Sequence, residues 1–319
     1  MPASLPRIAV IGECLVELRE AGTEYFTYNF GGDTFNTAVY MAKLGNRFGP
    51  FVDYISAVGD DHLSRQMLSF WDSKGVGTSL TQTISGLTVG LYFISVDHDG
   101  ERHFTYWRNA SAARELFETN ASDHILEELA KYNLIYISGI SLAVLKPLSR
   151  ERLLTRLANL AQTGVSIAFD CNHRPTLWQS EAEAKAVWER VFSFAKWVFL
   201  TREELLFLKS SNEMKIDFSI FGAWPAIEVI IKDGAAPCVI RSEDAIIQVP
   251  AKKVAQVVDT TAAGDSFSAG YLLARILGET IQNSAKIAHA LAAVVISHPG
   301  AIIPDSFIPD LLLMNNPAI

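Results

Sequence analysis

The sequence predicts an α/β fold in which a doubly wound, mostly parallel sheet is covered by helices on both faces. The first observation is a series of short β-branched runs, separated by helical patterns, at residues 8–11, 54–58, 134–137, 165–169, 197–200 and 229–231. The second is that these runs are largely apolar on both faces, as expected for parallel strands between two helix layers. The third is size, because 319 residues with 49% hydrophobic content can bury one large core. We therefore expect a single domain over residues 1–319.

Two segments interrupt this alternation, at residues 13–30 and 86–108. Residues 90–96 and 102–107, joined by a turn at 97–100, have the pattern of a β-hairpin. The two segments could pair into a small β-sheet that closes over a substrate as a lid. An ordinary extension of the sheet edge is the alternative.

Composition and charge exclude several classes of protein. The chain carries 27 Lys and Arg against 35 Asp and Glu, a formal charge of −8, which argues against a nucleic-acid surface. The sequence contains no run of 18 apolar residues, so no membrane span is expected, and the apolar run at residues 8–11 is too short for a signal peptide. The three cysteines have no CxxC spacing, so we expect a reduced, cytoplasmic protein without a zinc site or disulfide framework.

The most informative motif lies at residues 259–270, where small residues lead into an apolar helix. The backbone N–H groups of Ala262, Ala263 and Gly264, together with the helix dipole, would form a seat for a phosphate group. Asp265 would lie at its edge and could accept the proton of an attacking hydroxyl. This pattern indicates a phosphoryl-transfer site, although a helix capped by Thr or Asp has the same sequence.

Near the N-terminus, paired glycines precede a helix expected at residues 37–45. Gly32 would let a ligand approach the backbone, and Asp33 and Asn36 offer groups suited to sugar hydroxyls. An ordinary turn and helix cap is the alternative.

Other polar residues follow the predicted strands, where ligands bind in such a sheet. Tyr106 and Arg108 end the hairpin, and an arginine fork matches a carboxylate. The alternative for Arg108 is a solvated side chain beside core aromatics. The remaining strand-end residues are Asn172, Arg174, Thr201, Glu203, Glu204, Lys232, Asp233 and Gly234.

Three further features limit the chemistry. Glu203 or Glu204 could hold Mg²⁺ through water or simply complement a helix dipole. His289 lies on an apolar helix and has the pattern of a core residue. The phosphate loop, the protein-kinase motifs, the G-x-S-x-G elbow and a G-x-G-x-x-G after the first strand are all missing from the sequence. A kinase built on this chain would need another architecture.

Over essentially its whole length the sequence resembles the ribokinase-like (PfkB) sugar kinases. The motifs are Gly31-Gly32-x-x-x-Asn36, Lys232-Asp233-Gly234 and the segment from Asp259 to Asp265. Within that family it is most similar to the kinases of 2-keto-3-deoxygluconate. The segments that carry this closer resemblance are residues 11–14, 31–34, 106–109, 138–142, 172–178 and 300–304.

The resemblance implies an ATP-dependent kinase with Mg²⁺, K⁺ as a further ion, and a β-sheet lid through which two copies often pair. It implies that Asp265 is the base and that the amides of Ala262, Ala263 and Gly264 form the anion hole. It assigns the acidic sugar to Gly32, Asp33, Asn36, Tyr92, Tyr106, Arg108, Asn172 and Arg174. It assigns ATP to Thr201, Lys232, Gly234, Thr261, Gly264 and His289, Mg²⁺ through water to Glu204, and a monovalent cation to Asp259.

The chain departs from the family at two positions. The family more often has glycine at the position of Ala262, so the anion hole must form without a positive φ there or with strain. Thr201 replaces the usual asparagine of an N-x-x-E motif, so we expect the surroundings of the metal to differ from those usual in the family. Two rivals stay open: a kinase of a neutral sugar such as fructose or ribose, or of a nucleoside, and a sugar-binding sensor without turnover.

Overall fold

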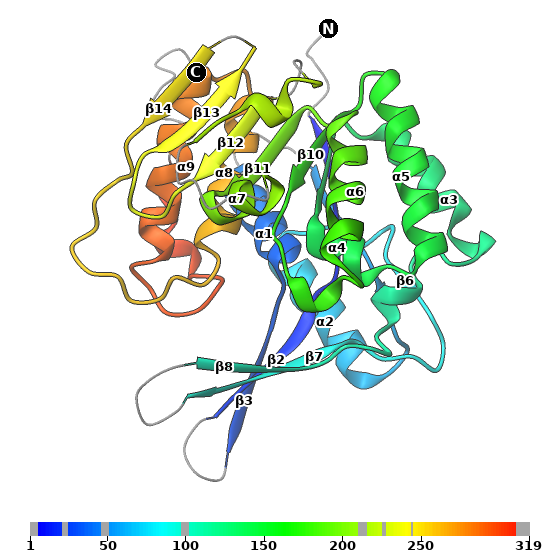
Figure 1. Cartoon of the computed structure of the whole chain (residues 1–319). Coiled ribbons are helices and arrows are strands. Elements are labelled where there is room, and N and C mark those ends of the chain that lie inside the picture. Colours follow the sequence, from blue (N-terminus) through cyan, green and yellow to red (C-terminus); the bar gives the residue numbers. More distant parts are fainter. Residues whose placement is uncertain are drawn as a thin grey trace, which may run out of the picture.

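One sheet forms the centre of the molecule (Figure 1). Within the described residues it is eight-stranded, parallel from β12 to β4 and antiparallel at β13 and β14. The apolar runs seen in the sequence therefore form the predicted strands. In spatial order the strands are β14 (Ala245–Val249), β13 (Cys238–Ser242), β12 (Glu228–Lys232), β11 (Trp197–Thr201), β10 (Ser166–Asp170), β9 (Leu134–Ser138), β1 (Arg7–Ile11) and β4 (Phe51–Ile55).

Helices cover both faces of this sheet because alternate residues of each strand point to opposite sides. In β1, Ile8 and Val10 pack into one apolar cluster, and Ala9 and Ile11 pack into the other. The first cluster is completed by α1 (Asp33–Gly45), α2 (His62–Ser73), α8 (Ala263–Ile276) and α9 (Ile281–Val295). The second is completed by α3 (Asp123–Glu128), α4 (Gly139–Val144), α5 (Pro147–Gln162), α6 (Glu181–Phe192) and α7 (Arg202–Lys209).

A second sheet projects from one end of the molecule, at the bottom of Figure 1. Its order is β3 (Phe26–Gly31), β2 (Leu15–Glu20), β7 (Leu91–Val96) and β8 (Arg102–Trp107). The pairs β2 with β3 and β7 with β8 are antiparallel, and β2 with β7 is parallel. We call this four-stranded sheet the lid sheet. Two short strands, β5 (Ala57–Val58) and β6 (Gln82–Thr83), pair separately.

The computed structural model describes residues 6–20, 25–45, 51–96, 102–209, 216–224, 228–243 and 245–310. The turn expected at 97–100 and residues 21–24 of the first lid segment lie outside the described residues. Helix α1 begins at Asp33, earlier than the helix expected at 37–45, so Asp33 and Asn36 lie in its first turn. Among the helices of the described ranges, none is long and apolar enough to cross a membrane.

Candidate active site

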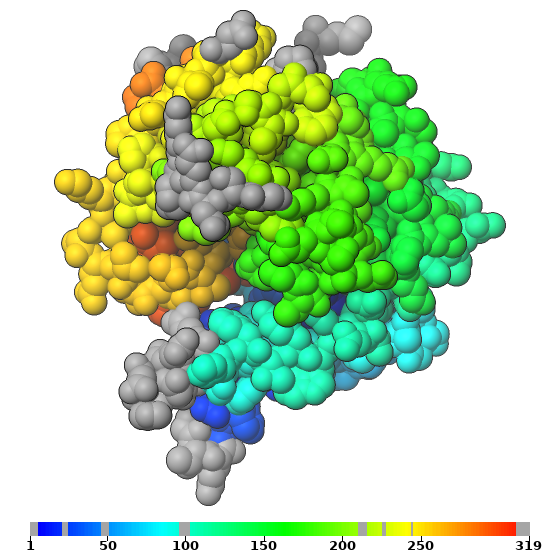
Figure 2. All heavy atoms as spheres, viewed as in Figure 1, coloured from blue at the N-terminus to red at the C-terminus, as the bar shows by residue number. Residues whose placement is uncertain are grey.

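A cavity of about 1030 Å³ lies between the lid sheet and the carboxyl ends of the central strands. Figure 2 shows the surface hollowed where the yellow-to-orange C-terminal segments meet the green and teal segments. The cavity brings together most of the residues predicted from the sequence. Those that line it are Gly32, Asp33, Asn36, Tyr92, Tyr106, Arg108, Asn172, Arg174, Thr201, Glu203, Glu204, Lys232, Asp233, Gly234, Thr261, Ala262, Ala263, Gly264 and Asp265.

The N-terminus of α8 forms one wall of the cavity. Ala262 precedes the helix in the left-handed conformation, with φ 61° and ψ 15°. The sequence left open whether Ala262 avoids a positive φ or adopts one with strain. The structure has the strained conformation, because the side chain of an L-residue is sterically unfavourable in this region. The N–H of Ala263 donates to the carbonyl oxygen of Thr260 at 3.2 Å. The first-turn N–H groups of a helix have no partner inside the helix, so this turn presents donors to the cavity.

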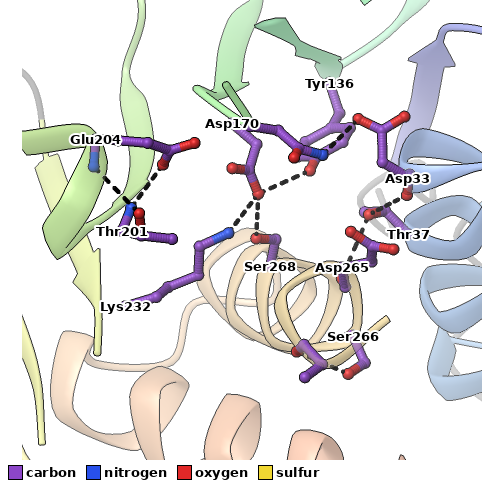
Figure 3. Close-up of polar contacts among 12 residues, drawn as sticks. Asp33, Thr37, Tyr136, Asp170, Thr201, Glu204, Lys232, Asp265, Ser266 and Ser268 are labelled. Carbon is purple, nitrogen blue, oxygen red and sulfur yellow. Dashed lines mark hydrogen bonds and ion pairs between the residues drawn. The ribbon is translucent and has the colours of Figure 1, made fainter. Parts of the chain in front are cut away.

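Asp265 lies in the first turn of α8, opposite the first turn of α1 (Figure 3). The Nδ2 of Asn36 donates to its Oδ2 at 2.9 Å, and the Oγ1 of Thr37 donates to its backbone oxygen at 3.3 Å. Burial, and then the nearby charge of Asp33, raise the pKa of Asp265 to about 7, although the bond from Asn36 acts in the opposite direction. Asp33 is itself fixed, because the Nδ2 of Asn172 donates to its Oδ2 at 2.9 Å. This carboxyl group is thus suited to exchange a proton near neutral pH.

Lys232 is the last residue of β12 and extends its ammonium group into the same region. Its Nζ lies 2.6 Å from Oδ2 of Asp170, the last residue of β10. Burial acts to lower the pKa of Lys232, but the charges of Asp170, Glu204 and Asp265 outweigh it and leave the pKa raised. The cavity wall therefore holds a permanent positive charge among carboxylates.

Thr201 and Glu204 form a capping box at the start of α7. The N–H of Glu204 donates to Oγ1 of Thr201 at 3.2 Å, and the N–H of Thr201 donates to Oε2 of Glu204 at 2.7 Å. The N–H of His173 donates to Oε1 of Glu204 at 2.6 Å. Burial, and then the charge of Asp170, raise the pKa of Glu204. This cap explains why a threonine stands at position 201. A Thr-x-x-Glu pattern before an apolar helix indicates such a capping box.

Glu204 also bears on the question of a metal ion. The described part of the chain contains no group of three or more His, Cys, Asp or Glu side chains that could form a metal cage. Mg²⁺ usually keeps several waters and binds one or two carboxylates together with phosphate groups. Glu204 is one of several carboxylates that line the cavity. Both of its oxygens already accept backbone hydrogen bonds, so it fits contact with such an ion through water rather than direct coordination.

The lid side of the cavity contains a buried ion pair that the sequence did not reveal. The Nε of Arg108 donates to Oε2 of Glu13 at 2.7 Å, and both residues are buried. The hydroxyl of Ser111 donates to the other oxygen of Glu13, and Tyr92 donates to Glu17. The charge of Arg108 is therefore compensated within the protein.

Arg174 differs from Arg108 in its surroundings. It is exposed at the cavity, and its Nη1 donates to the carbonyl oxygen of His173 at 2.9 Å. No carboxylate among the described residues forms an ion pair with it. Arg174 is thus the arginine of this cavity that is available to an anionic ligand.

Two predicted residues lie outside the lining of the cavity. Asp259 is buried and accepts hydrogen bonds from the N–H and Oγ1 of Thr261 and from the N–H of Gly300. His289 is buried in α9, where its Nε2 lies 3.1 Å from the carbonyl oxygen of Val249 and its ring packs on Phe267. Its surroundings are those of a core histidine. Burial lowers the pKa of His289.

The fold agrees with the comparisons with known proteins. The profile described as pfkB family carbohydrate kinase matches residues 5–307. The 2-dehydro-3-deoxygluconokinase of Escherichia coli (strain K12) is 42% identical over 306 residues, which are 95% of this chain and 99% of that one. The enzyme of the same name from Dickeya dadantii (strain 3937) is 43% identical over 309 residues, 95% and 98% of the two chains.

A solved structure gives the same result at the level of the fold. The 2-dehydro-3-deoxygluconokinase of Thermotoga maritima superimposes with a TM-score of 0.81 at 20% identity and covers 94% of this chain and 95% of its own. The predicted resemblance and the ribokinase-like fold are confirmed, and with them an enzyme that uses ATP and a divalent metal ion. The chain belongs to the pfkB family of carbohydrate kinases.

Proposed function

We propose that the protein transfers the γ-phosphoryl group of ATP to the terminal hydroxyl of 2-keto-3-deoxygluconate, which is also called 2-dehydro-3-deoxygluconate. The product would be 2-keto-3-deoxy-6-phosphogluconate. The observation that carries the chemistry is Asp265, a carboxyl group with a pKa raised to about 7 beside the N-terminus of α8. The names of the relatives that align over nearly the whole chain support the choice of sugar.

In this reaction Asp265 accepts the proton of the sugar hydroxyl while the hydroxyl oxygen bonds to the γ-phosphorus. The bond from that phosphorus to the bridging oxygen breaks, and its electron pair leaves with ADP. The amides of Ala262, Ala263 and Gly264 stabilise the charge on the transferring group. The N–H of Ala263 already donates to Thr260 at 3.2 Å, within the normal range, so it would have to share or exchange that bond to serve a phosphate oxygen.

We propose Mg²⁺ as the divalent ion, with Glu204 as the carboxylate that holds it through water. Bound to the phosphates of ATP, Mg²⁺ would neutralise part of their charge. The role of Asp259 in placing K⁺ remains a prediction. Both of its oxygens already accept hydrogen bonds, so a cation there would have to share them.

The carboxylate of the substrate distinguishes this sugar from neutral ones. Arg174 supports its recognition, since the described residues supply no anionic partner for it. Arg108 is paired with Glu13, so it would act indirectly. It would hold Glu13 and the adjacent Tyr106 ring in place, and the centroid of that ring lies 5.9 Å from its guanidinium carbon. The uncharged groups of Asn36 and Asn172, with Gly32, Asp33 and Tyr92, would surround the hydroxyls.

The test is ADP release with Mg-ATP and 2-keto-3-deoxygluconate, gluconate, fructose, ribose or adenosine at matched concentrations. We expect selective turnover of 2-keto-3-deoxygluconate. Arg174→Ala should raise its KM about 10- to 100-fold, the value of a hydrogen-bonded charge. Arg190→Ala, on α6 and paired with Glu151, is the matched control and should change nothing. Turnover of a neutral sugar would refute the substrate, and no turnover at all would refute the kinase and favour the sensor.

We also propose that two copies pair through the lid sheet. Its outer strands expose Phe26 (62%) and Trp107 (59%), whereas Phe104 lines the cavity together with Tyr106. Large apolar side chains exposed together on one face mark an interaction surface. Light scattering should give twice the mass of the chain, and Trp107→Lys with Phe26→Lys should give the monomer. A monomeric wild-type protein at micromolar concentration would refute this pairing.

A further inference from the structure

The ammonium group of Lys232 lies directly against the first turn of α8. A Cβ atom placed on Gly264 would lie 3.3 Å from its Nζ, so the ammonium and the backbone of Gly264 are neighbours. The helix dipole and the lysine charge therefore converge on the place where the proposed reaction moves a phosphoryl group. A lysine side chain is flexible, so this placement requires something that holds it.

Asp170 supplies that constraint. Its Oδ2 accepts hydrogen bonds from Nζ of Lys232 at 2.6 Å, from Oγ of Ser268 at 2.9 Å and from the hydroxyl of Tyr136 at 3.3 Å (Figure 3). The three donors come from β12, α8 and β9, and Asp170 itself ends β10. Asp170 is 3% exposed. Burial raises the pKa of Tyr136, which keeps its hydroxyl a donor. The position of this carboxylate is thus fixed from three sides.

We propose that Lys232 is the cation that stabilises the transferring phosphoryl group, and that Asp170, held by Ser268 and Tyr136, is the positioning residue for Lys232. The inference rests on the proposed function, because it concerns the same transfer. Lys232 keeps its protons throughout and acts by charge alone, while the proton of the sugar hydroxyl goes to Asp265.

The surrounding charges explain why one fixed ammonium matters here. Lys232 is influenced by Asp170, Glu204 and Asp265, and its Nζ lies 5.9 Å from the ring centroid of Phe199. ATP and an acidic sugar would both add negative charge to this wall. A cation fixed before the reaction stabilises charge that develops in the transition state without rearranging.

The alternative is a buried ion pair that only supports the fold. Experiment can distinguish a positioning role of Asp170 from a purely structural one. A positioning residue acts on turnover through Lys232, whereas a structural ion pair affects stability and leaves turnover of the folded enzyme unchanged. The experiment is a double-mutant cycle on kcat, with Kd values for ADP and sugar from calorimetry. It uses whichever sugar of the panel the wild-type protein phosphorylates, so a wrong substrate assignment leaves the cycle intact.

We expect Lys232→Met to lower kcat about 10²- to 10³-fold, as the loss of a fixed transition-state donor does. Asp170→Asn should lower kcat about 10- to 100-fold with less than about a threefold change in Kd. The double variant should be no slower than Lys232→Met, within about threefold, because Asp170 acts on the reaction chiefly through Lys232 and its charge adds only a smaller effect on Asp265. It also removes both buried charges, so it folds even if a single variant with one unpaired charge does not.

Milder variants with matched controls complete the test. Ser268→Ala should lower kcat several-fold at unchanged KM, whereas Ser266→Ala, which removes a hydroxyl bonded to the Ala263 carbonyl in the same helix, should not. Tyr136→Phe is compared with Tyr271→Phe, which removes a buried hydroxyl from Glu228. Two results would overturn the inference and leave the kinase intact. In the first, the wild type is active and kcat is unchanged by Asp170→Asn and by Ser268→Ala. In the second, the losses of kcat in the two single variants multiply in the double variant. No turnover of any sugar by the wild type would overturn both.

Discussion

Replacing Asp265 by Asn should stabilise the folded protein above pH 7 while abolishing its activity. In the folded protein the pKa of Asp265 is raised from 3.8 to about 7, first by burial and then by Asp33. Between these two values the unfolded chain has lost the proton that the folded chain retains. The free energy of unfolding therefore falls as pH rises through this window, and above pH 7 the full penalty of an ionised, buried carboxylate remains.

The size of the effect follows from the shift. About three pH units at about 1.4 kcal/mol each give a ceiling of about 4 kcal/mol. Because the side chain of Asp265 is partly exposed to the open cavity, solvent would screen its charge, and we expect about half of this, or about 2 kcal/mol. Asn can keep the bond from Asn36 through its own Oδ1, so little is lost in exchange. For a chain of 319 residues this raises Tm by about 3 °C.

The assay is thermal unfolding of the wild type and Asp265→Asn between pH 4 and pH 8.5. The difference in Tm should be near zero at the acid end and grow toward pH 8. Asp72→Asn, which removes a charge from an exposed site in α2, is the control for net charge. A difference that does not vary with pH, or a variant less stable than the wild type at pH 8, would refute the reasoning about this carboxyl group.

Two further predictions concern the same helix end. Asn36→Ala removes a bond that lowers the pKa of Asp265, and Asp33→Asn removes a charge that raises it. In the pH profile of kcat/KM, the acid limb should accordingly move to higher pH in the first variant and to lower pH in the second, by about 0.5 to 1 pH unit. Shifts of both variants in the same direction would contradict this. Ala262→Gly should relieve the left-handed conformation and stabilise by about 0.5 to 1 kcal/mol in urea unfolding, whereas Ala263→Gly, at the first helical residue, should destabilise by about as much. Equal effects of the two glycines would show that Ala262 is not strained.

The fold could be predicted because its signal is local. A strand such as β9 is buried along its whole length, so an apolar run marks it without reference to any partner. The lid strands were harder to assign, because β3 exposes Phe26 and Tyr28 and its apolar residues do not mark a buried face. The start of α1 was placed too late, since Asp33 and Thr34 have the composition of a turn although they begin a helix.

The site could be predicted only where one segment carries its own chemistry. The small residues before Asp265 indicate a phosphate seat because backbone amides and a helix dipole need no distant partner. Arg108 and Lys232 were predicted as ligand-binding cations, but their buried partners, Glu13 and Asp170, lie 95 and 62 residues away. Nothing in the local pattern around either carboxylate specifies that pairing. Lys232 and Asp170 meet where two strands of the central sheet end, and Arg108 and Glu13 meet where the lid sheet joins the central sheet. The pairing changes the chemistry in opposite ways: it neutralises Arg108 on the lid side, and it fixes Lys232 beside the reacting group.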